Sequence, residues 1–401
     1  MTNKLIWPLV CTLALLTIVC ACGSRSSNAT PPPPNPDFLY ALTLSGPPPN
    51  LSFQLSSLRV DSSTGALGSP STTTFGSQFV PGIAVEPNSK HLYASYPNPL
   101  ANTIGIFTID PNTGVPTQTS VFSLNVICPF CLPPSGPGEL TLSPGGKFLY
   151  YASSTLGGGV SQGIGALAVD SAAGTLSFVT GSPFPADQAP FIVRVHPSGQ
   201  FLYTENLDPS GADFIDLQSL SGFSVDASTG ALSPVPGSPF VPPVSATIGG
   251  LAIHPSGKFL YATSGIEANG ILAWNIDGTT GGLTVLTGSP FQVGVAIHSA
   301  AFDPSGKFLY ATAGPPGGLL GFNVDPNSGA LTPIPGSPFS SGSFLGGPTV
   351  EPSGHFLFAG DQPNHTIVGF SIDSATGALT ALGSPAPLSA RPISLTIVKV
   401  P

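Results

Sequence analysis

Arg194 and His298 are titratable side chains in stretches that otherwise hold small or apolar residues. A guanidinium in such surroundings needs a counter-charge or an anionic ligand. Glu205 and Asp208 follow Arg194 closely, so they are the expected partners of an ion pair. The alternative is that Arg194 and Asp208 bind substrate. The positions equivalent to Arg194 in similar stretches hold Ala84, Thr141, Ala252, Ala301 and Thr349.

Cys128 and Cys131 form a C-P-F-C string without a second C-x-x-C elsewhere. A metal site needs more ligands than this pair supplies, and a local disulfide suits an exported protein in an oxidising compartment. We therefore expect a disulfide between the two cysteines, and neither a metal nor a cofactor.

Two short strings each recur seven times along the chain, which is the pattern of a repeat architecture. The first is F-L-Y or a close variant, beginning at Phe38, His91, Phe148, Phe201, Phe259, Phe308 and Phe356. The second is D-x-x-x-G, with its acid at Asp61, Asp110, Asp170, Asp226, Asp277, Asp325 and Asp373. A calcium site needs six or more oxygens, so each lone Asp is expected to cap its own turn instead.

Each repeat predicts four strands. The first strand is a stretch of alternating apolar residues that ends in a turn such as His254-Pro255-Ser256-Gly257, and the F-L-Y string forms the second strand. The third strand leads into the Asp of the D-x-x-x-G string, and the fourth ends in G-S-P-F. Proline falls in turns and at strand starts, where its missing N–H is tolerated. We expect His196 and His254, which precede such prolines, to be solvated turn residues. Four strands per repeat predict an all-β, seven-bladed β-propeller with four-stranded antiparallel blades.

The two ends of the chain support this prediction. The first repeat lacks its first strand, because the residues before Phe38 are rich in proline. The segment 393–398 is a strand without a repeat of its own. If this C-terminal strand joins the first blade, it completes seven blades and removes an exposed sheet edge.

The composition agrees with a turn-rich β fold. The 401 residues include 49 Gly and 47 Pro, which both weaken helix interiors. Only 7% of residues are charged, and the net charge is −9 with 10 Lys and Arg. These values exclude a nucleic-acid-binding protein, which needs a basic surface.

The N-terminal segment predicts export. Lys4 precedes an apolar run of the length found in secretory signals, and Val19-Cys20-Ala21-Cys22 resembles a bacterial lipobox. We expect residues 1–21 to be a signal peptide, Cys22 to carry a lipid, residues 22–36 to be a Pro/Ser-rich linker and residues 37–401 to form the propeller. The alternative is a cleaved signal without lipid. Gly23 favours the outer membrane, with the domain facing the periplasm or the cell surface.

The loops between the second and third strands differ most among the repeats. They include residues 97–103, 206–219 and 361–366 and lie together on one face of a propeller. Variable loops on a rigid ring commonly carry binding sites. This face is therefore a candidate surface for an envelope protein or a glycan.

The strings D-P-S-G-K-F-L-Y-A and D-P-N-S-G-A-L-T resemble those of the lactonase-type propellers, a group with 6-phosphogluconolactonase, and of the YVTN surface-protein propellers. The resemblance covers about residues 37–401. His298 lies in an H-S-A-x-x-x-P string that is similar to one at the family's active site, so the resemblance implies a catalytic role for it.

The same resemblance implies an Arg in the next blade, where this chain has Gly346, and a Glu beyond that blade's second strand. Asp361 and Glu205 are candidate catalytic carboxylates, and His365, in the loop of Asp361, is a candidate substrate-binding residue. A lactonase must supply a base that activates water and a group that stabilises an oxyanion. Of the His, Arg and Glu that the resemblance implies, this chain has only the His at the matching position.

The sequence therefore favours an exported, lipid-anchored, monomeric propeller that acts as a binding or surface-scaffold module. One alternative is a lactone hydrolase of the 6-phosphogluconolactonase type with an altered active site. A second alternative is an assembly factor for envelope proteins.

Overall fold

The computed structural model describes most of the unit formed by Asn35–Pro401. The described ranges are 36–46, 52–76, 82–96, 102–124, 136–154, 163–207, 216–244, 246–265, 270–314, 318–340 and 344–399. The predictions for the signal peptide, Cys22, Cys128, Cys131 and Asp208 lie outside these residues.

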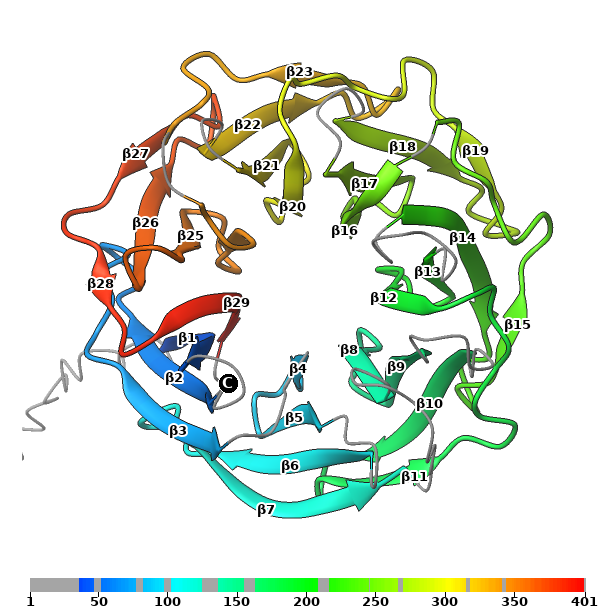
Figure 1. The fold of residues 1–401 in the computed structure, drawn as a ribbon, viewed down its shortest axis with the longest axis horizontal. Coiled ribbons are helices and arrows are strands. Elements are labelled where there is room, and N and C mark those ends of the chain that lie inside the picture. Colours follow the sequence, from blue (N-terminus) through cyan, green and yellow to red (C-terminus); the bar gives the residue numbers. More distant parts are fainter. Residues whose placement is uncertain are drawn as a thin grey trace, which may run out of the picture. The chain divides into compact units, whose positions relative to one another are not determined.

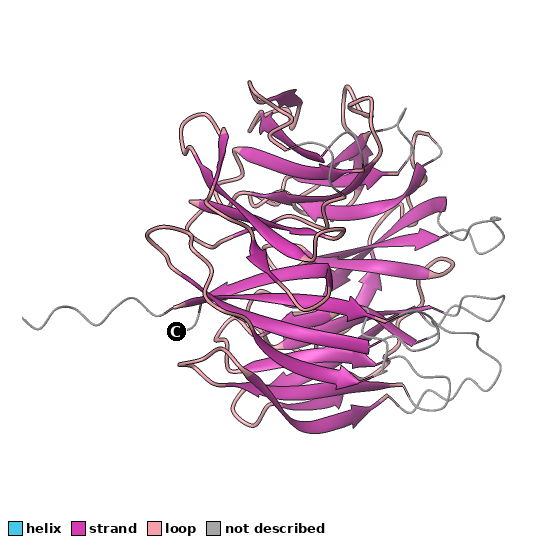
Figure 2. Ribbon diagram, turned by 60° about the vertical axis from the view of Figure 1, so that its left-hand side comes forward, coloured by secondary structure: helices cyan, strands magenta, loops and turns pink. Residues whose placement is uncertain are grey.

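Seven blades of four antiparallel strands surround a central axis, as predicted (Figure 1). The described residues form strands joined by turns and loops, which Figure 2 shows in an oblique view. From the axis outward, blade 1 contains β29 (Arg391–Lys399), β1 (Asp37–Ser45), β2 (Ser52–Val60) and β3 (Ser71–Gly76), and blade 2 contains β4 (Ile83–Val85), β5 (His91–Tyr96), β6 (Thr103–Ile109) and β7 (Pro116–Ser123). Blade 3 contains β8 (Gly136–Leu142), β9 (Phe148–Ser154), β10 (Gly163–Asp170) and β11 (Thr175–Phe178). Blade 4 contains β12 (Pro190–Val195), β13 (Phe201–Leu207), β14 (Asp216–Val225) and β15 (Leu232–Pro234).

The remaining three blades follow the same order from the axis outward. Blade 5 contains β16 (Ala246–Ile253), β17 (Phe259–Ser264), β18 (Ile271–Ile276) and β19 (Leu283–Val285), and blade 6 contains β20 (Ile297–Phe302), β21 (Phe308–Ala313), β22 (Gly318–Val324) and β23 (Leu331–Pro333). Blade 7 contains β24 (Thr349–Val350), β25 (Phe356–Asp361), β26 (Thr366–Ile372) and β27 (Leu379–Ala381), and β28 (Ala386–Pro387) also pairs with β26.

The C-terminal strand closes the ring in the first blade. β29 pairs antiparallel with β1, with Phe38 opposite Val398 and Tyr40 opposite Thr396. In Figure 1 the red β29 lies on the axis side of the blue strands β1 and β2. The predicted closure is therefore confirmed, and the strand is slightly longer than the 393–398 segment expected from the sequence.

The D-x-x-x-G strings form the expected Asx turns. In blade 4, Asp226 Oδ1 accepts hydrogen bonds from the backbone N–H groups of Ser228 and Thr229, at 2.9 and 2.8 Å. Gly230 has a φ of 76°, which favours glycine at this position. These turns supply the carbonyl groups that join neighbouring blades.

Five tyrosines of the F-L-Y strings, in blades 1, 3, 4, 5 and 6, each link their blade to the next. The Tyr203 hydroxyl, for example, donates to the Gly281 carbonyl across the blade 4–5 boundary at 2.8 Å. We call this interaction the Tyr–Gly contact. The other four pairs are Tyr40–Gly114, Tyr150–Gly230, Tyr261–Gly329 and Tyr310–Gly377.

The expectation that His196 and His254 are solvated was wrong. Both are buried, at 7% and 5% exposure. Nε2 of His196 lies 2.8 Å from the Gly257 carbonyl in the next blade, and Nε2 of His254 lies 2.8 Å from the Gly306 carbonyl. Burial lowers the pKa of His254, so its neutral form donates across the boundary. These histidines join blades instead of facing solvent.

Candidate functional site

A cavity of about 710 Å³ lies among the inner strands of the ring. Its walls include residues of β8, β12, β16, β20 and β29, five inner strands that Figure 1 shows around the axis. Glycine and alanine supply much of the lining of β16 and β20. Arg194, Glu139 and His298 are the ionisable groups among the described lining residues.

Arg194 forms an ion pair with a residue that sequence reasoning missed. Its Nη1 lies 2.6 Å from Oε2 of Glu139, and each side chain is about one third exposed, at 34% and 33%. Nη1 also donates to the Val193 carbonyl at 3.0 Å. The direct partner therefore comes from β8 of the preceding blade, whereas Glu205 and Asp208 were the expected partners.

Glu139 carried a signal that could have identified it. It stands two residues before Thr141, a position that we aligned with Arg194. A charged side chain on an inner strand among small residues is the same departure that singled out Arg194. The pairing brings two blades together at the cavity wall.

Glu205 is fully buried on β13, and neither carboxylate oxygen has a hydrogen-bond partner among the described residues. Burial raises the pKa of Glu205 to about 8, an effect that Arg194 opposes and Glu139 reinforces. Glu205 is therefore a neutral acid at pH 7. It does not belong to the described lining of the cavity, although it is close enough to Arg194 for their charges to interact.

His298 lines the same cavity as Arg194. Its ring packs against Phe344 with the centroids 4.9 Å apart, and a Cβ on Gly314 would lie 3.1 Å from Nε2. Burial lowers the pKa of His298, so the imidazole is neutral at pH 7. Within the described residues it makes no hydrogen bond, so packing alone orients the ring.

Asp361 and His365 lie at the turn between β25 and β26. Oδ2 of Asp361 accepts a hydrogen bond from Asn364 Nδ2 at 2.9 Å, so this carboxylate caps the turn. His365 is exposed with a φ of 52°, and its carbonyl accepts from the Leu388 N–H at 2.8 Å. Neither residue lines the cavity, but the adjacent Gln362 does.

The structure thus groups the predicted residues into two sets. Arg194 and His298 share the cavity, with Glu205 buried near Arg194. Asp361 and His365 lie together at the β25–β26 turn. Among the residues that the structure describes, no group of three or more His, Cys, Asp or Glu is arranged to hold a metal ion, and no helix is long and apolar enough to cross a membrane.

The family model of the seven-bladed β-propeller lactonases matches residues 216–344 and 301–393. Over this stretch the chain is similar to the seven-bladed lactonase propellers. The matched segments include His298, Asp361 and His365, whereas Arg194, Glu205 and Glu139 lie before them.

Solved lactonase-type structures share the fold over nearly the whole propeller. A putative 6-phosphogluconolactonase from Bacteroides uniformis has a TM-score of 0.68 at 15% identity, over 91% of this chain and 100% of that one. A putative 6-phosphogluconolactonase from Bacteroides fragilis has a TM-score of 0.65 at 18% identity, over 91% of this chain and 98% of that one. The periplasmic gluconolactonase PpgL of Pseudomonas aeruginosa has a TM-score of 0.64 at 18% identity, over 91% of this chain and 100% of that one. No curated protein matches the chain.

Proposed function

We propose that the protein hydrolyses an uncharged lactone in its central cavity, with His298 as the general base. The observation that carries this proposal is a neutral imidazole on the wall of a cavity of about 710 Å³ in a lactonase-type propeller. A neutral imidazole can accept a proton at pH 7 without first losing one.

The proposed reaction consumes one water molecule. His298 accepts a proton as the water oxygen bonds to the lactone carbonyl carbon, and negative charge develops on the carbonyl oxygen. The C–O bond of the ring then breaks, and the imidazolium returns its proton to the leaving ring oxygen. The product is a hydroxy acid, which releases its acidic proton to solvent.

Arg194 is suited to hold the developing oxyanion. Only Nη1 of its guanidinium makes contacts among the described residues, with Glu139 and the Val193 carbonyl. Its other N–H groups remain available as charge-assisted donors. Glu139 fixes the guanidinium at the cavity wall, and so we assign it a positioning role.

The charge of the cavity favours an uncharged substrate. Arg194 is the one cation among the described lining residues, and Glu139 already neutralises it. A phosphorylated lactone would bring additional negative charges, and the described lining holds no second cation to receive them. A sugar lactone without phosphate, as in the name of the periplasmic relative, suits this cavity better.

The location of the activity follows from the N-terminal sequence. We propose that residues 1–21 direct export, that Cys22 carries a lipid and that the propeller works in the periplasm or at the cell surface. Export would separate the protein from the phosphorylated sugars of central metabolism, in agreement with an uncharged substrate.

A lactone panel tests the proposal. Purified protein is assayed against glucono-1,5-lactone, its 6-phosphate and an aliphatic γ-lactone, with the spontaneous rate subtracted. We expect the uncharged sugar lactone to be preferred, and His298→Ala to lower kcat/KM by about 100-fold or more. His355→Ala is the matched control, because His355 is an exposed turn histidine, and its activity should be unchanged. No enzymatic rate, or equal rates for the wild type and His298→Ala, would contradict the proposal.

A binding module without catalysis is the second candidate. It is favoured by two observations: no described residue forms an orienting hydrogen bond with His298, and Asp361 lies at a turn instead of the cavity wall. Such a protein would retain an envelope protein or a glycan in a pull-down from envelope extracts while showing no lactone turnover. An assembly factor would retain envelope proteins through the variable loops.

A further inference from the structure

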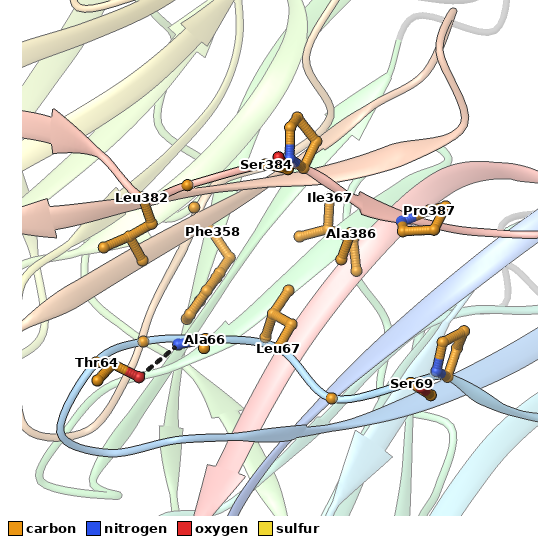
Figure 3. Close-up of a pocket in the computed structure, with 16 residues that line it drawn as sticks. Thr64, Ala66, Leu67, Ser69, Phe358, Ile367, Leu382, Ser384, Ala386 and Pro387 are labelled. Carbon is orange, nitrogen blue, oxygen red and sulfur yellow. Dashed lines mark hydrogen bonds between the residues drawn. The ribbon is translucent and has the colours of Figure 1, made fainter.

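A second cavity, of about 440 Å³, lies where the ring closes between blade 7 and blade 1. We call this boundary the seam and the cavity the seam groove. Figure 3 shows Leu67 of blade 1 facing Ile367 and Ala386 of blade 7, with the Phe358 ring pointing toward the segment that contains Ala66. The groove is independent of the central cavity, because the two share no lining residue.

Each of the other six blade boundaries has a phenylalanine from the fourth-strand segment of one blade. These residues pack against the apolar cluster of their boundary and are Phe75, Phe122, Phe184, Phe240, Phe291 and Phe339. The equivalent residue at the seam is Ala386. The G-S-P-F string of blade 6 reads G-S-P-A in blade 7.

The backbone confirms that Ala386 occupies the phenylalanine position. Ala386 pairs with Ile367 on the third strand of its blade, as Phe291 pairs with Ile271 two blades earlier. A groove of about 540 Å³ also lies at the blade 5–6 boundary, where it is lined by Phe291, but its described lining includes no second-strand residue. The seam groove reaches Phe358 on the second strand, so the missing ring leaves it open to a deeper layer.

A hydroxyl group is also missing at the seam. Five boundaries have the Tyr–Gly contact, and in blade 2 the Tyr93 hydroxyl donates to Glu86 instead. Blade 7 has no hydroxyl at this position, because Phe358 stands where its neighbour has Tyr310. The carbonyl that would accept this hydroxyl belongs to Gly65, a lining residue of the groove. It accepts no hydrogen bond from the described residues. The seam therefore lacks both a phenyl ring and a phenolic donor.

From this comparison among the repeats we infer that the seam groove is a binding site for a small, uncharged phenol. The aromatic ring of the ligand takes the place held by a phenylalanine at the other boundaries, and its hydroxyl donates to the Gly65 carbonyl. Leu67, Leu382 and Phe358 supply the apolar walls. The described lining includes no charged residue, which excludes an ionic ligand.

Titration of the full-length protein with p-cresol tests this inference, followed by ligand-observed NMR and by the thermal unfolding midpoint. Wild-type protein should bind one p-cresol saturably, and toluene, which lacks the hydroxyl, should bind at least fivefold more weakly. Ala386→Phe should lower p-cresol affinity at least tenfold and raise the unfolding midpoint, because the introduced ring fills the groove. The midpoint shows that the variant is folded.

Two further variants separate the ring from the hydroxyl. Phe358→Tyr should weaken p-cresol binding and leave toluene binding unchanged, because its own hydroxyl occupies the Gly65 carbonyl. Phe339→Ala should open a corresponding groove in blade 6 but leave the p-cresol stoichiometry at one, because the Tyr310 hydroxyl already occupies the Gly377 carbonyl at that boundary. The inference is overturned if p-cresol does not saturate, if toluene binds equally well, or if Ala386→Phe binds p-cresol like the wild type.

Discussion

At the scale of single residues, the informative signal was a departure from the repeat. Arg194 and His298 replace the small residues of other inner strands, and the structure places both on one cavity. Glu139 departed from the pattern in the same way, but the ion pair needs the register of two neighbouring blades, which no single sequence contains. Asp361 had the expected residue type, yet its role at the turn depends on Asn364 three residues later.

Glu205 makes folding stability depend on pH. This carboxyl has an ordinary pKa of 4.5 when unfolded and a pKa of about 8 when folded. Between these values the folded state holds more protons, so the unfolding free energy falls as pH rises, by up to about 1.4 kcal/mol per pH unit. Below pH 4.5 this destabilisation is absent.

Glu205→Gln removes the titrating group and should flatten this dependence. Urea unfolding at pH 5, 6, 7 and 8 measures it, with the wild type and the variant converging at the acidic end. The variant should be the more stable protein at pH 8. Parallel curves across the range would show that Glu205 does not titrate as described.

At the scale of elements, the repeats made the strands predictable from the sequence but did not indicate the contacts between neighbouring blades. The F-L-Y and D-x-x-x-G strings indicated β-strands and Asx turns, and both are present in the structure. The Tyr–Gly contact joins these two strings across a blade boundary, over 67 to 80 residues. His196 and His254 were misassigned for the same reason, because their acceptors lie in the next blade.

The Tyr–Gly contact has a measurable stability effect. Tyr261→Phe leaves the Gly329 carbonyl without its donor and should cost about 1–3 kcal/mol in urea unfolding. Phe358→Tyr adds the missing hydroxyl at the seam and should stabilise the fold by about 0.5–1.5 kcal/mol. If both substitutions changed stability in the same direction, the contact would not account for their effects.

At the scale of the whole molecule, ring closure joins the two ends of the described chain. β29 pairs with β1 along its length and shields the inner edge of the first blade. The leftover C-terminal strand in the sequence was enough to predict this arrangement. The seam itself was not predictable, because the Ala386 and Phe358 replacements form one groove only after blades 7 and 1 meet.

Termination of the chain after Ala390 removes β29 and tests closure. The unpaired edge of β1 should lower the thermal unfolding midpoint by roughly 10 °C or more and promote association through strand edges. A peptide of residues 391–399 added in excess should restore the midpoint by strand addition. A truncated protein as stable and monomeric as the full chain would argue against closure by β29.

The pH dependence of kcat/KM for an uncharged sugar lactone tests the central claim most directly. Burial places the pKa of His298 below 6.5, and the base must be neutral to act. We expect activity, after subtraction of the spontaneous rate, to be level near pH 7 and to fall tenfold per pH unit below an apparent pKa that is lower than 6.5. His298→Ala should abolish this limb. Undetectable hydrolysis, or the same limb in the variant, would contradict the assignment of His298 as the base in the central cavity.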